Sequence, residues 1–148
     1  MNSLTGKSNA PSDVSPAHQS AIEAKPLVLV VEDHDDTRFM LEYLLGIYGC
    51  RVALAADGED ALHVAESEHP DLILMDMSLP RLDGFATTRR IRALAALHDV
   101  PIVFLSGYTH PALRAEALAI GGNDYLTKPF VIGQLENVIQ RHLGKTVW

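Results

Sequence analysis

The stretch LILMDMSLP, residues 72 to 80, joins four consecutive apolar residues directly to a carboxylate, Asp76, and closes with a proline. A continuous apolar run is typical of a strand that is covered on both faces. A carboxylate at the end of such a run is costly to bury unless other groups compensate its charge. The stretch therefore predicts a buried strand with a charged site at its carboxyl end.

The composition of the chain limits what kind of protein it is. With 148 residues, 47% of them apolar, it has room for one hydrophobic core and predicts a single globular domain. The net charge of −7 argues against nucleic acid as a direct partner. The one cysteine, Cys50, cannot form a disulfide within the chain and fits a reducing cytoplasm. No apolar run approaches the roughly 18 residues of a membrane span, so we expect no membrane association.

The pattern around this stretch alternates between apolar blocks and amphipathic segments. The first 25 residues are rich in Ser, Ala and Pro without any period, and predict a flexible leader. The apolar blocks that follow are residues 27–32, 51–55, 72–76, 100–106 and 124–128. In the first segment between blocks, the residues at helical spacing are Phe39, Tyr43 and Ile47, with Met40 and Leu44. Strict alternation of strand and helix predicts a doubly wound, five-stranded parallel α/β sheet.

Polar residues stand at the carboxyl ends of four of these blocks. The first ends in Glu32 and Asp33, the third in Asp76, the fourth in Ser106, and the fifth in Thr127, Lys128 and Pro129. In a doubly wound sheet, functional groups gather at the carboxyl ends of the strands. The sequence therefore predicts one site that contains all of these side chains.

The charges of this predicted site require a cation. Glu32, Asp33 and Asp76 would bring up to three negative charges close together, and one lysine cannot balance them. Magnesium takes carboxylate oxygens, waters and phosphate oxygens, and so it suits this set of ligands. Beside magnesium and Lys128, Asp76 is the natural nucleophile toward a phosphoryl group, because carboxylates can form acyl phosphates.

Four ordered motifs now identify a family. They are VVED with the acidic pair, LILMDMSLPRLDG with the acceptor Asp, PIVFLSG with a hydroxyl residue, and GGNDYLTKPF with the lysine. In these motifs, from Pro26 to about Gly144, the chain resembles the receiver domain of two-component response regulators. The resemblance implies a flavodoxin-like fold with the strand order 2-1-3-4-5, and residues 26–144 as the receiver domain.

The resemblance also implies the role of each acidic residue. Asp76 would accept a phosphoryl group from a phosphohistidine on a sensor histidine kinase or a histidine phosphotransfer protein. Asp33 and Asp76 would bind Mg²⁺ directly, Glu32 would reach it mainly through water, and Ser78 would offer its backbone carbonyl. The domain would then be a regulatory phosphoacceptor, not an enzyme acting on other substrates.

The remaining site residues would bind and sense the phosphoryl group. Lys128 would pair with its oxygens, aided by a cis Lys128–Pro129 peptide bond, and Ser106 would hydrogen-bond to it. Tyr125 would be an aromatic switch that turns inward as Ser106 moves. Simpler interpretations stay open: Ser106 as a turn residue and Tyr125 as a packed edge aromatic.

Several features point beyond the phosphoryl site. Only residues 145–148 follow the domain, so we expect a stand-alone receiver that docks on an unknown downstream protein or passes the phosphoryl group on. Val131 lacks the side chain of a helix cap, and with Ile132 it predicts an exposed apolar surface for a partner or for a homodimer. Tyr108, two residues after Ser106, is expected to restrict attacking water and prolong the phosphorylated state.

Some charged residues have plainer interpretations. Asp83 is expected to cap the helix that follows it. His34, beside the acidic pair, is interpreted as a solvated loop residue. The run Arg89, Arg90 and Arg92 is interpreted as a solvated helix face.

Two alternative functions share features with this site. A phosphatase of the haloacid dehalogenase type also combines a nucleophilic Asp with Mg²⁺, but such enzymes resemble one another in placing the nucleophile before the acidic pair, with a second acid two residues after it. Here the pair comes first and Ser78 stands at that second position. The other alternative is a phosphorylation-independent scaffold with a receiver fold, which would have lost the acceptor, an acidic residue or the lysine. All three are present.

Overall fold

A computed structural model describes residues 25–107 and 110–144 of the chain. In this part of the chain, five parallel strands form one sheet in the order β2-β1-β3-β4-β5. The strands are β1 (Leu27–Val31), β2 (Arg51–Ala55), β3 (Leu72–Asp76), β4 (Ile102–Ser106) and β5 (Asp124–Thr127). The predicted fold class and strand order are confirmed. The expected leader and tail lie almost entirely outside the described residues.

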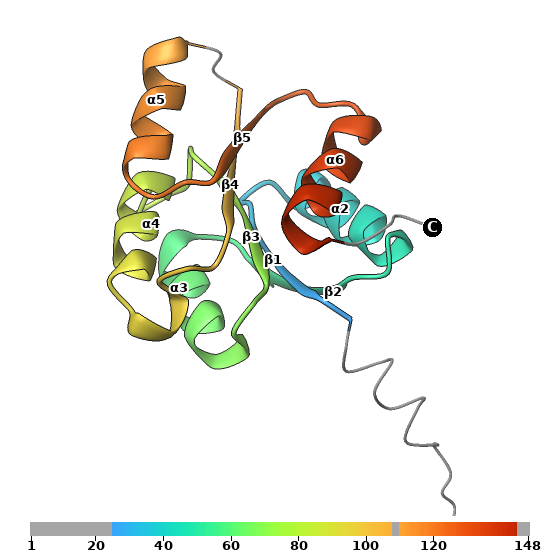
Figure 1. Cartoon of the computed structure of the whole chain (residues 1–148), viewed down its shortest axis with the longest axis horizontal. Helices are drawn as coiled ribbons and strands as arrows, with labels where there is room; N and C mark the ends of the chain where they lie inside the picture. Colours follow the sequence, from blue (N-terminus) through green and yellow to red (C-terminus); the bar gives the residue numbers. More distant parts are fainter. Residues whose placement is uncertain (1–24, 108–109, 145–148) are drawn as a thin grey trace, which may run out of the picture.

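Helices cover both faces of the sheet (Figure 1). They are α2 (Asp35–Ile47), α3 (Gly58–Glu68), α4 (Gly84–Arg92), α5 (Pro111–Ala119) and α6 (Ile132–Leu143), with a short 3₁₀ helix, η1 (Ala95–Leu97). In Figure 1, α2 and α6 lie on one side of the sheet, and α3, α4 and α5 lie on the other. This arrangement follows from right-handed crossovers that change side at β1, where the chain reverses its direction across the sheet.

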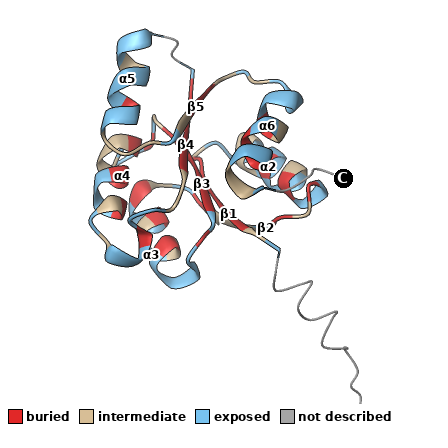
Figure 2. Cartoon of the chain, in the orientation of Figure 1, coloured by how far each residue is buried: buried red, intermediate tan, exposed pale blue. Residues whose placement is uncertain are grey.

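The core therefore consists of two apolar layers, one on each face of the sheet. On one face, Val30, Leu74 and Leu105 pack with residues of α2 and α6. On the other face, Met75 and Phe104 pack with residues of α3, α4 and α5. Figure 2 shows the buried strands in the centre and exposed outer helix faces. Burial on both faces explains why β1, β3 and β4 are continuously apolar rather than alternating.

The buried face of α2 differs from the one that the spacing predicted. Leu41 and Leu45 are fully buried, whereas Tyr43 is 71% exposed. The exposed large apolar residues of this helix are Phe39, Met40, Tyr43 and Ile47. Two apolar stripes at helical spacing compete here, and packing against β1 and α6 selects the leucine stripe.

Three helix starts agree with their sequence signals. Pro111 is the first residue of α5. Asp83 Oδ1 accepts a hydrogen bond from the Ala86 backbone N–H at 2.8 Å, which confirms it as the cap of α4. Val131 has no capping side chain, and its N–H instead donates to Gln134 Oε1 at 2.9 Å.

The end of α4 departs from the expectation of a solvated arginine face. Arg89 and Arg90 are exposed, but the guanidinium of Arg92 donates hydrogen bonds to three residues. Its partners are Gly121 O at 2.8 and 3.1 Å, Leu97 O at 3.1 Å and Asn123 Oδ1 at 2.9 Å. Arg92 thus joins α4, η1 and the turn before β5.

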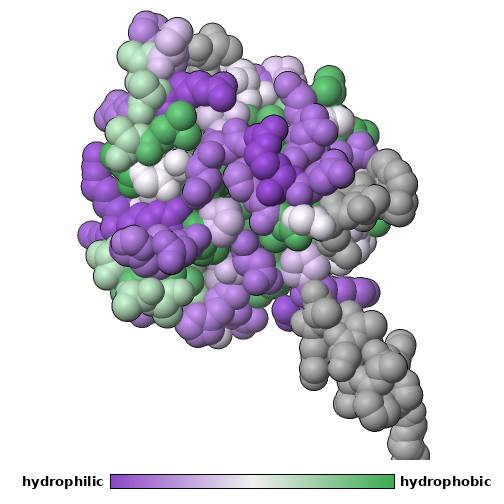
Figure 3. All heavy atoms as spheres, viewed as in Figure 1, coloured by the Kyte–Doolittle hydropathy of each residue, from purple (hydrophilic) through white to green (hydrophobic). Residues whose placement is uncertain are grey.

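The surface is mainly hydrophilic in the view of Figure 3, with separate small apolar patches. Val131 and Ile132 are exposed, as expected, at 66% and 55%. Their use in self-association remains a prediction. Among the described residues, no helix combines the length and the apolar character that crossing a membrane requires.

Replacement of Arg92 by methionine is expected to lower the free energy of unfolding by about 2 kcal/mol, because the substitution leaves partly buried carbonyl groups without donors. Urea denaturation measures this change. Arg90→Met is the matched control, since Arg90 is an exposed arginine of the same helix, and it should shift stability by less than about 0.5 kcal/mol. Equal effects of the two substitutions would contradict the joining role of Arg92.

Candidate functional site

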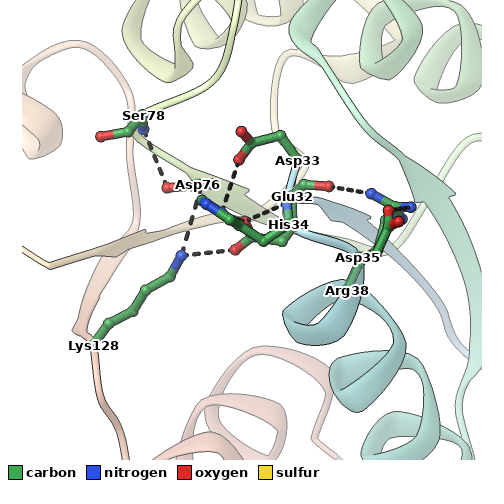
Figure 4. Close-up of polar contacts among 8 residues, drawn as sticks. All are labelled: Glu32, Asp33, His34, Asp35, Arg38, Asp76, Ser78 and Lys128. Atoms are coloured by element: carbon green, nitrogen blue, oxygen red, sulfur yellow. Dashed lines mark hydrogen bonds and ion pairs between the residues drawn. The ribbon is translucent and has the colours of Figure 1, made fainter.

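The carboxyl ends of β1 and β3 bring the predicted acidic residues together. Glu32 and Asp33 follow β1, and Asp76 is the last residue of the neighbouring β3. Glu32 is fully buried and Asp76 is 4% exposed. Figure 4 shows these side chains facing a common space at the edge of the sheet. One predicted site is therefore formed, as the strand order required.

Lys128 enters this space from the end of β5. Its Nζ lies 2.7 Å from Glu32 Oε1 and 3.6 Å from Asp76 Oδ2. The Lys128–Pro129 peptide bond is cis, as expected. The Lys128 backbone N–H donates to Ser106 O at 2.6 Å, which fixes the chain beside β4 as the side chain leaves the sheet.

The two serines of the predicted site lie on either side of Asp76. The Ser78 backbone N–H donates to Asp76 Oδ1 at 3.1 Å and fixes the orientation of that carboxylate. Ser106 is the buried last residue of β4, and β4 pairs directly with β3. Both residues are therefore placed near the Asp76 carboxylate, one from the loop and one from the sheet.

The pKa values of the two buried carboxylates, Glu32 and Asp76, are shifted in opposite directions. Burial and the charge of Glu32 raise the pKa of Asp76 to about 6, against the lowering effect of the Ser78 N–H and of Lys128. Burial also acts to raise the pKa of Glu32, but hydrogen bonds from Lys128 and His34 outweigh it and lower the pKa. Lys128 therefore compensates Glu32 first, and Asp76 remains the carboxylate that needs a further cation.

The donor atoms fit a divalent cation. Glu32, Asp33, His34 and Asp76 each offer one ligand atom, and these atoms all lie within 4.8 Å of one another. Asp33 Oδ1 is shielded from solvent, and within the described residues it accepts no hydrogen bond. A shielded carboxylate oxygen without a donor is a suitable ligand for a hard cation such as Mg²⁺.

Two neighbours of the acidic pair were not identified from the sequence. His34 is not merely solvated, because its Nδ1 lies 3.1 Å from Glu32 Oε2 and 3.3 Å from Asp33 Oδ1. Arg38 donates to the Glu32 backbone O at 2.9 Å and to Asp35 Oδ1 at 2.5 Å (Figure 4). It thereby holds the turn from β1 into α2. In the sequence, the signal for this contact is the position of Arg38, one turn into the helix that follows the acidic pair.

Gly84 lets the loop after β3 pass close to the backbone of Asp76. A Cβ on Gly84 would lie 2.7 Å from Asp76 O, so any side chain would collide with the backbone of β3. The motif LDG thus combines a helix cap, Asp83, with a close backbone approach.

The proposed switch residues are only partly described. Tyr125 is buried on β5, and the guanidinium of Arg114 lies 5.9 Å from the centre of its ring. Its movement remains a prediction. Tyr108 lies outside the described residues.

Comparison with known proteins agrees with this geometry. The sequence profile described as "Response regulator receiver domain" matches residues 28–140. The chain is 38% identical over 122 residues to a probable transcriptional regulator ycf27 of Cyanophora paradoxa, covering 82% of the chain and 50% of the relative. It is 41% identical over 110 residues to the transcriptional regulatory protein PrrA of Mycobacterium tuberculosis, covering 74% and 46%. The chain therefore spans about half the length of these relatives.

Solved structures show the same fold. The chain superposes, with a TM-score of 0.76 and 40% identity, on the receiver domain of sensor histidine kinase PA1611 from Pseudomonas aeruginosa PAO1. The alignment covers 82% of this chain and 99% of that domain, which holds a magnesium ion coordinated in its active site cleft. With the matching profile, strand order and site, this chain belongs to the family of response regulator receiver domains of two-component systems.

Proposed function

We propose that Asp76 accepts a phosphoryl group from a phosphohistidine on a sensor histidine kinase or a histidine phosphotransfer protein, in a Mg²⁺-dependent reaction. The observation that carries this proposal is a buried carboxylate with a raised pKa, 3.6 Å from a lysine and beside two further carboxylates. Receiver domains in general are regulatory phosphoacceptors. By this proposal the chain turns over no other substrate.

In the transfer, an Asp76 oxygen attacks phosphorus, and the bond from phosphorus to the histidine nitrogen breaks. The electron pair stays on that imidazole nitrogen, which then takes up a proton. Lys128 Nζ stands 3.6 Å from Asp76 Oδ2 of the attacking carboxylate and would pair with the phosphoryl oxygens, while the Ser106 hydroxyl would hydrogen-bond to them. Such transfer depends on positioning and charge stabilisation more than on further covalent chemistry.

The metal ligands would be Asp33 and Asp76 directly, Glu32 mainly through water, and the backbone carbonyl of Ser78. A bound Mg²⁺ would supply positive charge that offsets the carboxylates and the phosphoryl oxygens. Asp33 Oδ1 is already shielded and without a hydrogen-bond donor among the described residues, which favours this role. The Ser78 N–H keeps Asp76 Oδ1 oriented, so the acceptor is held in place before the donor arrives.

Phosphorylation would be read by a protein partner. Tyr125 would turn inward as Ser106 moves toward the phosphoryl group, and the altered surface would bind a downstream protein or the group would be passed on. The net charge of −7 favours a protein over a nucleic acid as the direct partner of this domain. The relatives named above, a probable transcriptional regulator and a transcriptional regulatory protein, are about twice as long as the segment that this chain matches.

Incubation with a small acyl phosphate donor is expected to add one phosphoryl group to the wild type, only when Mg²⁺ is present. Intact mass measured at once after mixing reports the gain. Asp76→Asn should show none, because an amide oxygen is a far poorer nucleophile toward phosphorus.

Asp83→Asn is the matched control for this experiment. Asp83 belongs to the same loop but caps α4, and asparagine caps a helix equally well, so this variant should label like the wild type. Labelling of Asp76→Asn, or labelling that persists in a chelator, would contradict the proposal.

The raised pKa of Asp76 also predicts how stability depends on pH without divalent cations. The folded state holds the proton up to about pH 6, whereas the unfolded state releases it near about pH 4. Stability contributed by this group is therefore present below about pH 4 and lost as the pH rises to about 6. Relative to Asp76→Asn, the wild type should lose on the order of 2 kcal/mol across this window.

Urea denaturation in a chelator at several pH values measures this difference, and effects common to both proteins cancel. Addition of Mg²⁺ near neutral pH should restore stability to the wild type more than to Asp76→Asn, because the ion binds the folded state. A difference between the two proteins that does not change from about pH 4 to about pH 7 would show that Asp76 carries no burial penalty.

A further inference from the structure

We propose that His34 binds a divalent transition metal in this site directly through Nδ1. This nitrogen ligand increases the affinity of the site for Zn²⁺, Co²⁺ or Ni²⁺ relative to its affinity for Mg²⁺. This inference rests on the metal site of the proposed function. It assigns to the site a nitrogen ligand and a class of ion that the phosphoryl chemistry does not require.

The first support is the spacing of the donor atoms. His34 Nδ1 lies 3.1 Å from Glu32 Oε2 and 3.3 Å from Asp33 Oδ1. Two ligands that each stand about 2.1 Å from a metal, at octahedral or tetrahedral angles, are about 3.0 to 3.4 Å apart. Both separations fall in this range, and the ligand atoms of the whole cluster lie within 4.8 Å of one another.

The second support is how the oxygens are shared. Lys128 Nζ donates a hydrogen bond to Glu32 Oε1, and the other oxygen of this carboxylate, Oε2, faces His34 Nδ1. Asp33 Oδ1 is shielded and receives no hydrogen bond within the described ranges. Glu32 Oε2 also accepts a hydrogen bond from the His34 backbone N–H at 3.1 Å, and this contact holds the carboxylate oxygen beside the imidazole (Figure 4).

The third support is that, among the described residues, the contacts of the His34 imidazole are with the two acidic residues Glu32 and Asp33. His34 is the N-cap residue of α2, but its side chain makes no capping hydrogen bond, although caps are usually chosen for one. The side chain is 74% exposed and packs against no core cluster. Imidazole is a good ligand for Zn²⁺, Co²⁺ and Ni²⁺, whereas Mg²⁺ takes oxygen ligands, so this residue distinguishes the two classes of ion.

Isothermal titration of untagged protein with Zn²⁺ and, separately, with Mg²⁺ tests the proposal at about pH 8, above the ordinary pKa of imidazole. His34→Gln should weaken Zn²⁺ binding about tenfold or more, because even lost support to a metal ligand costs that much. Mg²⁺ binding should change by less than about twofold. Nitrogen NMR of the histidine rings should show Zn²⁺ at Nδ1 of His34, an effect that an indirect role would not produce.

His98→Gln is the matched control. His98 Nδ1 also lies 3.1 Å from a single carboxylate oxygen, that of Asp99, and its side chain is 71% exposed, but it is far from the acidic cluster in the fold. This variant should bind Zn²⁺ like the wild type. If His34→Gln leaves Zn²⁺ affinity unchanged, or weakens Zn²⁺ and Mg²⁺ equally, His34 is not a selective ligand. If the wild type still binds Mg²⁺ when His34 fails this test, only the role of His34 is contradicted. If the wild type does not bind Mg²⁺ at all, the proposed function and the role of His34 that rests on it are both contradicted.

Discussion

Burial of two carboxylates, Glu32 and Asp76, is the constraint on which the site depends. They stand on neighbouring strands and are almost completely shielded from water, so neither can ionise freely without a cation. Lys128 supplies one charge, and it lies closer to Glu32 than to Asp76. The resulting asymmetry lowers the pKa of one carboxyl and raises that of the other, which leaves Asp76 as the group whose charge is least compensated.

The strand order brings the groups that compensate these charges to the same edge of the sheet. Because β1, β3, β4 and β5 lie side by side, their carboxyl ends bring three carboxylates, a hydroxyl and a lysine to one edge of the sheet. Short backbone contacts then fix the details, such as the Ser78 N–H on Asp76 and the Lys128 N–H on Ser106 O. Arg38 adds a contact from α2 that holds the backbone at Glu32. The same edge therefore contains both the charged side chains and the backbone groups that orient them.

Most of the fold was predictable, because apolar blocks and breaks mark strands and helices locally. The position of β3 follows from LILMD, and the start of α4 follows from Asp83. Helix faces were harder to predict. On α2, two apolar stripes have similar spacing, and only contacts with β1 and α6 show that Leu41 and Leu45 are the buried pair. Arg92 was misassigned for a related reason, since its partners come from residues up to 31 positions away in the sequence.

The sequence by itself determined the alternation of strands and helices and which residues stand at the strand ends, because periodicity and motif order are local properties of the chain. Only the tertiary structure decided which charges meet. Lys128 is 96 positions from Glu32, and their 2.7 Å contact depends on the sheet bringing β1 and β5 to one edge. The contact of His34 with both acids also needed the folded turn, because side-chain direction after a strand depends on backbone angles that no spacing rule gives.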